Sequence, residues 1–273
     1  MESPGKSAAA LNYFLQIPEL NLSPLRLPFG NFSTCDRIDY GQAFIFPKEK
    51  MLGKQAETCF EYFLKHNPNY RLLSANIQIP GTGKTLGELD YIISETATSR
   101  QYHIELACKF YLWDKNLDLQ LLGQWIGPNR KDRLADKIYK LETRQFPLLF
   151  TPETATALSN LSLDFNSIKQ QLCLKVFLFI PKLAAASDLP EEFQHCIAGH
   201  YIHEADLHLN LDGHATYALP TKKEWLLPPA SLRKWMSFDQ AEEKIREQLV
   251  QQRSPLVYRQ LNGKIEKFFI VWW

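Results

Sequence analysis

Two short segments of the sequence carry charged residues at alternating positions, the spacing that places side chains on one face of a β-strand. Glu88 and Asp90 lie in LGELDYII, and Glu105 and Lys109 lie in HIELACKFYLW. If these strands pair side by side, three carboxylates and a lysine gather on one patch of sheet. Crowded carboxylates repel one another, and hard oxygen ligands suit Mg²⁺ or Mn²⁺. A nearby lysine can orient a metal-bound water or stabilise charge on a phosphate. The pattern therefore indicates a site for phosphodiester hydrolysis.

The same four residues also fit a simpler interpretation, in which they form the solvated face of an antiparallel sheet. Lys109 would then pair with Glu105 or Asp90, as exposed charges commonly do. The neighbouring residues favour the first interpretation, because Tyr91-Ile92-Ile93 and the segment 104–112 are apolar on much of both faces. That composition is typical of a covered central sheet, where a charged side chain is unusual unless it has a functional or structural role.

The residues before the acidic strand end like a phosphate-binding P-loop, with Gly83-Lys84-Thr85. A P-loop reads G-x-x-x-x-G-K-[ST] and opens a helix. Here Gln78 stands where the first glycine belongs, and the residues after Lys84 alternate as a strand does. We therefore expect a glycine-rich hairpin turn over 81–84 between two strands. No ATP or GTP site is expected at this GTGKT turn.

The elements around these segments follow from hydrophobic periodicity and from proline and glycine breaks. We predict an α/β (α+β) fold with a mixed central sheet, whose core has the order helix, strand, strand, strand, helix, strand. The three successive strands should form an antiparallel meander that the fourth joins. The chain divides into an extended arm (1–50), the core (51–185) and a C-terminal α+β elaboration (186–273). The core elements are a helix over 54–66, strands over 72–80, 86–94 and 102–113, a helix over about 130–145, and a strand over 174–181. Outside the core we predict helices over 8–15 and 238–251 and strands over 198–211, 215–219, 256–261 and 266–273.

Composition limits the classes of function. The 273 residues carry a net charge of +1, so any nucleic-acid binding must depend on a local basic patch. The five cysteines are odd in number, and none forms C-x-x-C, which favours a reduced, cytoplasmic setting over a disulfide framework. The longest apolar runs are too short to span a bilayer, so no membrane partner is expected. The sequence does not predict the oligomeric state.

The blocks LGELDYII, HIELACKFYLW and GPNRKDRLADKIYKLETRQF resemble a bacterial family of unknown function, catalogued as domain of unknown function 1853 (DUF1853). The resemblance covers most of the chain. By remote similarity that family is placed in the PD-(D/E)XK nuclease-like superfamily, whose core has the element order given above. The resemblance implies a nuclease-like core and a Mg²⁺- or Mn²⁺-dependent nuclease, in which Asp90 and Glu105 bind the metal and Lys109 is the motif lysine.

Two further acids enter through the same resemblance, and one spacing departs from the superfamily pattern. Glu57, on the first core helix, could match a helical glutamate that some members use, and Glu88 could complete the site. The superfamily places its lysine two residues after the acid, whereas this chain reads E-x-x-x-K, with Ala107 in the intervening position on the same face. Glu105 and Lys109 should therefore lie roughly 13 Å apart along the strand.

A stripe of basic residues on the second core helix is the local candidate for nucleic-acid binding. Its members recur every three or four residues and are Arg130, Arg133, Lys137, Lys140 and Arg144. They could contact phosphates, or they could form an ordinary solvated face diluted by Asp132 and Asp136. The class that competes with a nuclease is a catalytically inactive, nuclease-like module that binds nucleic acid or a protein.

Overall fold

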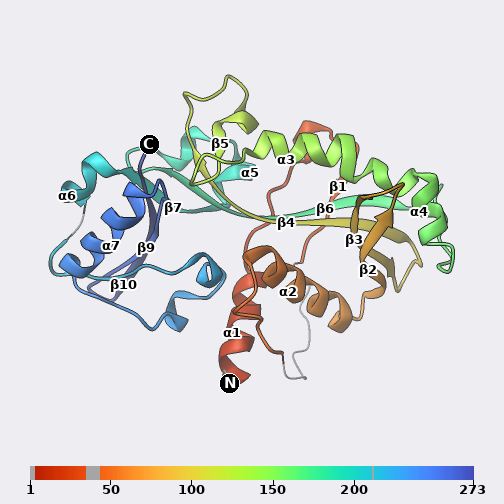
Figure 1. Cartoon of the computed structure of the whole chain (residues 1–273), viewed down its shortest axis with the longest axis horizontal. Helices are drawn as coiled ribbons and strands as arrows, with labels where there is room; N and C mark the ends of the chain where they lie inside the picture. The colour runs from red at the N-terminus through yellow and green to blue at the C-terminus, as the bar shows by residue number, and fades with distance from the viewer. Residues whose placement is uncertain (1–3, 35–43, 211) are drawn as a thin grey trace.

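The computed structural model describes residues 4–34, 44–210 and 212–273. Within these ranges ten strands form one mixed sheet, in the order β2-β3-β4-β6-β7-β10-β9-β8, with β1 beside β6 and β5 beside β4. The molecule is elongated, with β2 and β3 at one end and β8 to β10 at the other (Figure 1). The strands are β1 (Gly30–Asn31), β2 (Tyr70–Pro80), β3 (Thr85–Glu95), β4 (Gln101–Trp113), β5 (Trp125–Ile126), β6 (Lys169–Pro181), β7 (Ile197–His203), β8 (Thr216–Ala218), β9 (Leu256–Leu261) and β10 (Lys264–Val271).

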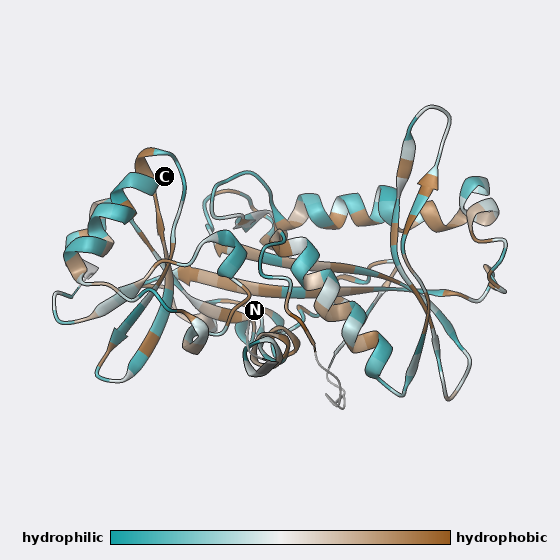
Figure 2. Ribbon diagram, turned by 60° about the horizontal axis from the view of Figure 1, so that its bottom comes forward, coloured by the Kyte–Doolittle hydropathy of each residue, from teal (hydrophilic) through white to brown (hydrophobic). Residues whose placement is uncertain are grey.

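Helices cover both faces of this sheet (Figure 1). They are α1 (Pro4–Leu15), α2 (Leu52–His66), α3 (Leu134–Lys140), α4 (Pro152–Ala157), α5 (Glu191–Gln194), α6 (Leu207–Asn210) and α7 (Phe238–Val250). Phe60 and Phe63 of α2 pack with Ile104 on one face, whereas Leu134 and Ile138 of α3 pack on the other. The long strands in the middle are largely hydrophobic, as a doubly covered sheet requires (Figure 2).

The antiparallel meander predicted from the sequence is confirmed. β2 pairs with β3 and β3 pairs with β4, both antiparallel, and β6 joins β4 in parallel. The turn between β2 and β3 is closed by a hydrogen bond from Gly81 N to Lys84 O of 2.9 Å, and Gly83 has a φ of 78°. Because β3 begins at Thr85, no helix follows the glycine-rich turn, so it lacks the architecture of a P-loop.

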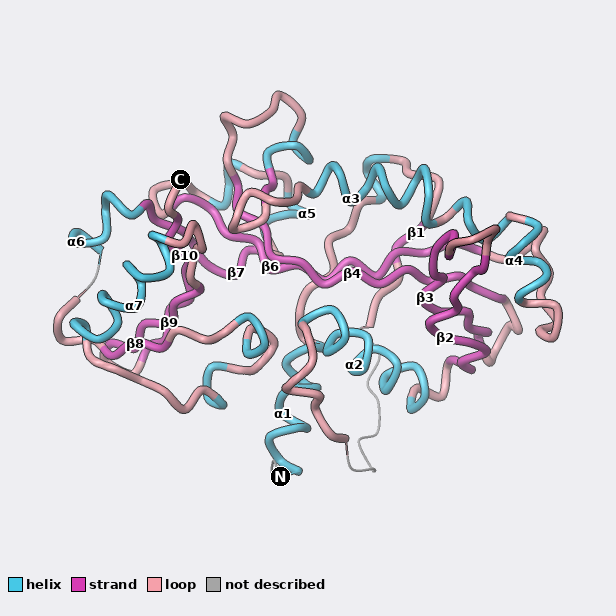
Figure 3. The backbone as a smooth tube through the Cα atoms, in the orientation of Figure 1, coloured by secondary structure: helices cyan, strands magenta, loops and turns pink. Residues whose placement is uncertain are grey.

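Four neighbouring strands, β4, β6, β7 and β10, run parallel to one another. β4 and β6 are the longest, at 13 residues each, and they lie side by side through the middle of the molecule (Figure 3). The predicted C-terminal elements therefore extend the same sheet as the core. The predicted strand over 198–211 is too long, since β7 ends at His203 and the chain turns into α6.

The predicted helix over 130–145 begins later than its periodicity indicates. α3 starts at Leu134, and a π-helical turn, Leu141–Gln145, continues it. Tertiary contacts hold the preceding residues in a loop. Asn129 Oδ1 accepts from Ser254 N at 2.8 Å, Pro128 O accepts from Ser254 Oγ at 2.7 Å, and Arg130 has a φ of 55°. Arg130 therefore does not lie on the helix that was expected to carry it.

The N-terminal arm is held to the sheet by a buried lysine of β6. Lys175 is fully buried, and its Nζ donates to Ile17 O at 2.9 Å, to Thr34 Oγ1 at 2.8 Å and to Glu19 Oε1 at 2.6 Å. Burial raises the pKa of Glu19, but the charge and hydrogen bond of Lys175 outweigh it and leave the pKa below its usual value. Four cysteines of the described ranges, Cys59, Cys108, Cys173 and Cys196, are free thiols, and Cys35 lies outside those ranges.

Candidate active site

Asp90 and Glu105 come together where β3 and β4 separate. The paired residues nearest this point are Tyr91 and Ile104, so the register continued by one residue places Asp90 opposite Glu105. Leu106 N donates to Asp90 Oδ2 at 2.9 Å, and this side-chain bond takes the place of a backbone ladder bond. Opposed residues of an antiparallel pair point to the same face. The two carboxylates therefore share the face that α3 covers.

Glu105 is fully buried, and both of its oxygens accept hydrogen bonds. His103 Nε2 lies 3.1 Å from Glu105 Oε1, and Gln145 Nε2 donates to Glu105 Oε2. The Nε2 of Gln170 donates to Phe146 O at 2.7 Å and lies 3.2 Å from His103 Nδ1. Since an amide nitrogen only donates, His103 Nδ1 must accept from Gln170. His103 Nε2 is then the protonated nitrogen, and it donates a hydrogen bond to Glu105 Oε1. The imidazole is therefore a fixed positioning group for the carboxylate.

Lys137 reaches this site from α3. Its Nζ donates to Gln145 Oε1 at 2.8 Å, so the Gln145 amide links the lysine to Glu105. Burial lowers the pKa of Lys137, while the negative charges of Glu105 and Asp90 act in the opposite direction. Gln145 ends the π-helical turn, a type of turn that is frequent at functional sites. Lys137 is therefore the lysine that the fold places beside the two acids.

The pKa of Asp90 is raised to about 7. Burial is the largest cause and the charge of Glu105 the second, while the Leu106 N–H and Lys137 act in the opposite direction. Ionising two neighbouring carboxylates that have little access to water costs free energy. Near neutral pH, binding either a proton or a cation therefore stabilises the site. A carboxyl group perturbed in this way is a mark of functional sites.

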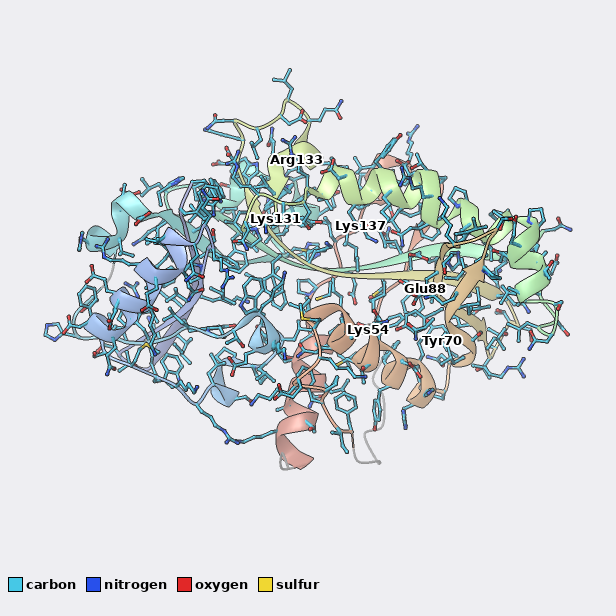
Figure 4. The ribbon with its side chains drawn as sticks, in the orientation of Figure 1. Lys54, Tyr70, Glu88, Lys131, Arg133 and Lys137 are labelled. Atoms are coloured by element: carbon cyan, nitrogen blue, oxygen red, sulfur yellow. The ribbon has the colours of Figure 1, made fainter. Side chains whose placement is uncertain are left out.

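A second pair of acids lies beside this site. Asn76, opposite Asp90 across the β2–β3 pair, has a φ of 51°. With its nitrogen turned towards them, its amide donates to Glu57 Oε2 at 3.1 Å and to Glu88 Oε1 at 3.2 Å. Lys54 Nζ donates to Glu57 Oε2 at 2.5 Å. Lys54 on α2, Glu88 on β3 and Lys137 on α3 surround this part of the sheet (Figure 4). We call Glu57, Glu88, Asp90 and Glu105 the carboxylate cluster.

Asp90 and Glu105 are the members of the carboxylate cluster that could hold a Mg²⁺ or Mn²⁺ ion. In the described part of the chain no group of three or more His, Cys, Asp or Glu side chains is arranged to hold a metal ion. Mg²⁺ is usually held by one or two carboxylates and completed by waters and substrate phosphates. Asp90 and Glu105 supply two such carboxylates, and Glu57 interacts electrostatically with Asp90. The chemistry of the donor set therefore suits a hard divalent cation.

The other predicted site residues lie further away or face elsewhere. Lys109 Nζ bonds Asp132 Oδ2 at 3.0 Å, and among the described residues no ion pair joins Lys109 to Glu105. Of the basic stripe, Arg130 is in the loop before α3 and Lys137 belongs to the site just described. Arg133 is half-buried, whereas Lys140 and Arg144 are exposed. Sequence reasoning missed Gln145, His103 and Asn76, although His103 lies two residues before Glu105 on the same predicted face.

These features define a mixed α/β protein with an acidic pair, buried Glu105 and half-buried Asp90, under a lysine-bearing helix. A family model described as "Domain of unknown function (DUF1853)" matches residues 40–271. The match spans most of the chain, so the protein belongs to the DUF1853 family. No match was found among curated proteins or among solved structures. Within the described ranges, no helix combines the length and the apolar character needed to cross a membrane.

Replacing Asn76 by Asp is expected to strengthen binding of Mg²⁺ and to weaken the metal-free fold. The new carboxylate would face Glu57 and Glu88 and would lose the amide donor, at a cost of about 1–3 kcal/mol without metal. Asp tolerates the left-handed backbone as Asn does, so the backbone is not the cause. Urea unfolding with and without Mg²⁺ measures both effects. Asn262→Asp is the matched control, because Asn262 has a φ of 50° in the distant β9–β10 turn. If the two substitutions change stability and Mg²⁺ binding equally, the proposal of a cation near Asn76 is contradicted.

Proposed function

We propose that this protein is a metal-dependent nuclease of the PD-(D/E)XK-like type, which hydrolyses phosphodiesters with Mg²⁺ or Mn²⁺. The observation that supports this most is the position of Asp90 beside Glu105 on adjacent strands, with Lys137 linked to Glu105 through Gln145. The raised pKa of Asp90 adds to it, because a buried carboxylate pair is costly unless a cation compensates. A bacterial origin and a cytoplasmic setting belong to the same proposal.

The residues have distinct roles in this proposal. Asp90 and Glu105 would hold the metal, and Glu57 and Glu88 would add negative charge beside it. When bound, the metal would act as a Lewis acid and acidify a water. Lys137, whose pKa is lowered by burial, is suited to accept a proton from water or to bind a phosphate oxygen. His103 and Gln145 fix the orientation of the Glu105 carboxylate, which binding and chemistry both require.

The second candidate is a catalytically inactive, nuclease-like module that binds nucleic acid or a protein. The observation that favours it is the hydrogen bonding of Glu105, both of whose oxygens already accept from protein donors. Lys109, which the superfamily pattern would use, bonds Asp132 instead. In this alternative the acidic pair has no catalytic role, and binding depends on exposed basic residues.

A cleavage screen separates the two candidates. Labelled single- and double-stranded DNA and RNA are incubated with Mg²⁺, Mn²⁺ or a chelator. The nuclease proposal predicts cleavage of at least one substrate that requires metal and is lost in Asp90→Ala. The control is Glu243→Ala on the exposed face of α7. Binding without cleavage by the wild type would support the inactive module, and residual cleavage by Asp90→Ala at the wild-type rate would reveal a contaminating nuclease.

If nucleic acid binds along α3, replacing Arg133 and Lys140 by Ala is expected to weaken binding similarly for all sequences. Losing about two phosphate contacts should lower the log–log salt slope by roughly one to two units. Fluorescence anisotropy in chelator at several salt concentrations measures the slope without cleavage. The matched control is the exposed pair Lys244 and Lys264 at the other end of the sheet. Unchanged affinity and slope would remove α3 from the binding surface.

A further inference from the structure

A pocket of about 590 Å³ lies at the carboxyl ends of the parallel strands, away from the carboxylate cluster. Trp113, Pro181 and His203, which line it, are the last residues of β4, β6 and β7, and Trp273 follows β10. In open α/β sheets, ligands bind outside the carboxyl ends of parallel strands. Trp113 is eight residues beyond Glu105 on β4, so the two sites are roughly 26 Å apart along the strand.

Arg130 forms one wall of this pocket together with an aromatic platform. Its guanidinium carbon lies 4.7 Å from the centroid of the Trp273 ring. Trp273 Nε1 donates to Pro128 O at 3.0 Å, and the Tyr201 ring packs 5.8 Å from the Trp273 ring. One third of the Arg130 side chain, 33%, is exposed. The platform is therefore built by packing before any ligand arrives, and the guanidinium stays accessible.

The pocket is lined by two cations and two carboxylates, and the donors of the cations can reach an anion. The guanidinium of Arg130 has one acidic neighbour among the described residues, Asp114 Oδ2, at an ion-pair distance of 3.7 Å that leaves its N–H donors free. Asp114 also accepts from Asn116 N at 3.1 Å, and Asp188 accepts from Ala185 N at 3.3 Å, so both acids serve local turns. Lys115, which also lines the pocket, is exposed. The cationic groups available to an anion are thus Arg130 and Lys115, and the two carboxylates balance their charge.

We propose that this pocket binds a nucleoside monophosphate, with the phosphate on Arg130 and Lys115 and the base against the half-buried ring of Trp273. The volume lies in the usual range for small-molecule sites and is too large for phosphate alone. An arginine stacked on an indole presents both charge and a planar face, which suits a phosphate beside a base. The site is separate from the carboxylate cluster and does not require hydrolysis there.

The test is calorimetric titration of the full chain with AMP, GMP, CMP and UMP, and with adenosine and inorganic phosphate as partial ligands. At least one nucleotide should bind at least tenfold more tightly than either partial ligand. Arg130→Gly should weaken that binding at least tenfold, since glycine accepts the backbone φ of 55° while the guanidinium is removed. Arg26→Gly is the matched control, because Arg26 is exposed and has a φ of 52° in the N-terminal arm.

Lys115→Gln, at an exposed residue, is a second variant in case Arg130→Gly lowers the melting temperature of the protein. It should also weaken nucleotide binding. Asp90→Asn should leave nucleotide binding unchanged, which separates this site from the proposed metal site. The proposal is overturned if no nucleotide binds the wild type saturably, or if phosphate binds as tightly as the nucleotides. Unchanged nucleotide affinity in both Arg130→Gly and Lys115→Gln would overturn it equally.

Discussion

Without metal at pH 8, Asp90→Asn is expected to be more stable than the wild type by on the order of 2–4 kcal/mol. Burial and the charge of Glu105 raise the pKa of Asp90 from 3.8 to about 7. A carboxyl group with a raised pKa contributes stability below the unfolded value, near pH 4, and loses it as the pH rises through 7. The amide of the variant carries no charge, and its oxygen can still accept from Leu106 N. The advantage of the variant should therefore appear between pH 5 and pH 8.

Urea unfolding in chelator at pH 5 and pH 8 measures this difference. Glu243→Gln, on the exposed face of α7, is the control for loss of one negative charge and should show no such pH dependence. Adding Mg²⁺ at pH 8 should stabilise the wild type and leave Asp90→Asn nearly unchanged, since a ligand stabilises the state it binds. A variant less stable than the wild type at pH 8 would show that Asp90 is held by favourable contacts and has no need of a cation.

Lys137→Ala is expected to lower metal-dependent cleavage by about 10²-fold or more, whereas Lys109→Ala should lower it less than about tenfold. Lys137 shares the Gln145 amide with Glu105, and both acids act on its pKa. Lys109 instead bonds Asp132, in the loop just before α3, at 3.0 Å. Removing Lys137 therefore takes away a cation that acts on both acids, whereas removing Lys109 takes away the partner of Asp132.

Single-turnover cleavage at saturating Mg²⁺ measures the chemical step for both variants. Lys140→Ala is the control on the same helix, because Lys140 is exposed and belongs to the same basic stripe. Melting curves show whether each variant is folded under the conditions of the assay. A larger loss in Lys109→Ala than in Lys137→Ala would assign the catalytic lysine to the position that the E-x-x-x-K spacing indicates.

The acidic pair could be predicted from the sequence because it depends on local rules. Alternation along a strand fixes the faces of Asp90 and Glu105, and a short glycine-rich turn makes β2 and β3 neighbours. β3 and β4 are likewise consecutive and antiparallel, so their register follows from a short connection. For these consecutive strands, residues that are close in the sequence pattern are also close in space, so the spacing alone predicts which side chains meet.

The rest of the site depends on tertiary contacts that sequence spacing does not contain. Gln145 reaches Glu105 because a π-helical turn follows α3, and a regular helix would direct it elsewhere. Asn76 lies in a left-handed conformation within β2, which alternation cannot indicate. Arg130 leaves the predicted helix because Ser254 and Trp273, more than a hundred residues away, bind the loop that contains it. The sequence pattern consequently indicates Lys109 on the strand, and not Lys137 on the helix, as the lysine of the site.

The most direct test of the proposed metal site is calorimetric titration of the chelator-treated protein with Mg²⁺ and Mn²⁺ at pH 8. Asp90→Asn and Glu243→Gln are titrated under the same conditions. The proposed site predicts saturable binding to the wild type and to Glu243→Gln, and at least tenfold weaker binding to Asp90→Asn. Equal affinities of all three proteins, or no binding to the wild type, would contradict a metal site at Asp90 and Glu105.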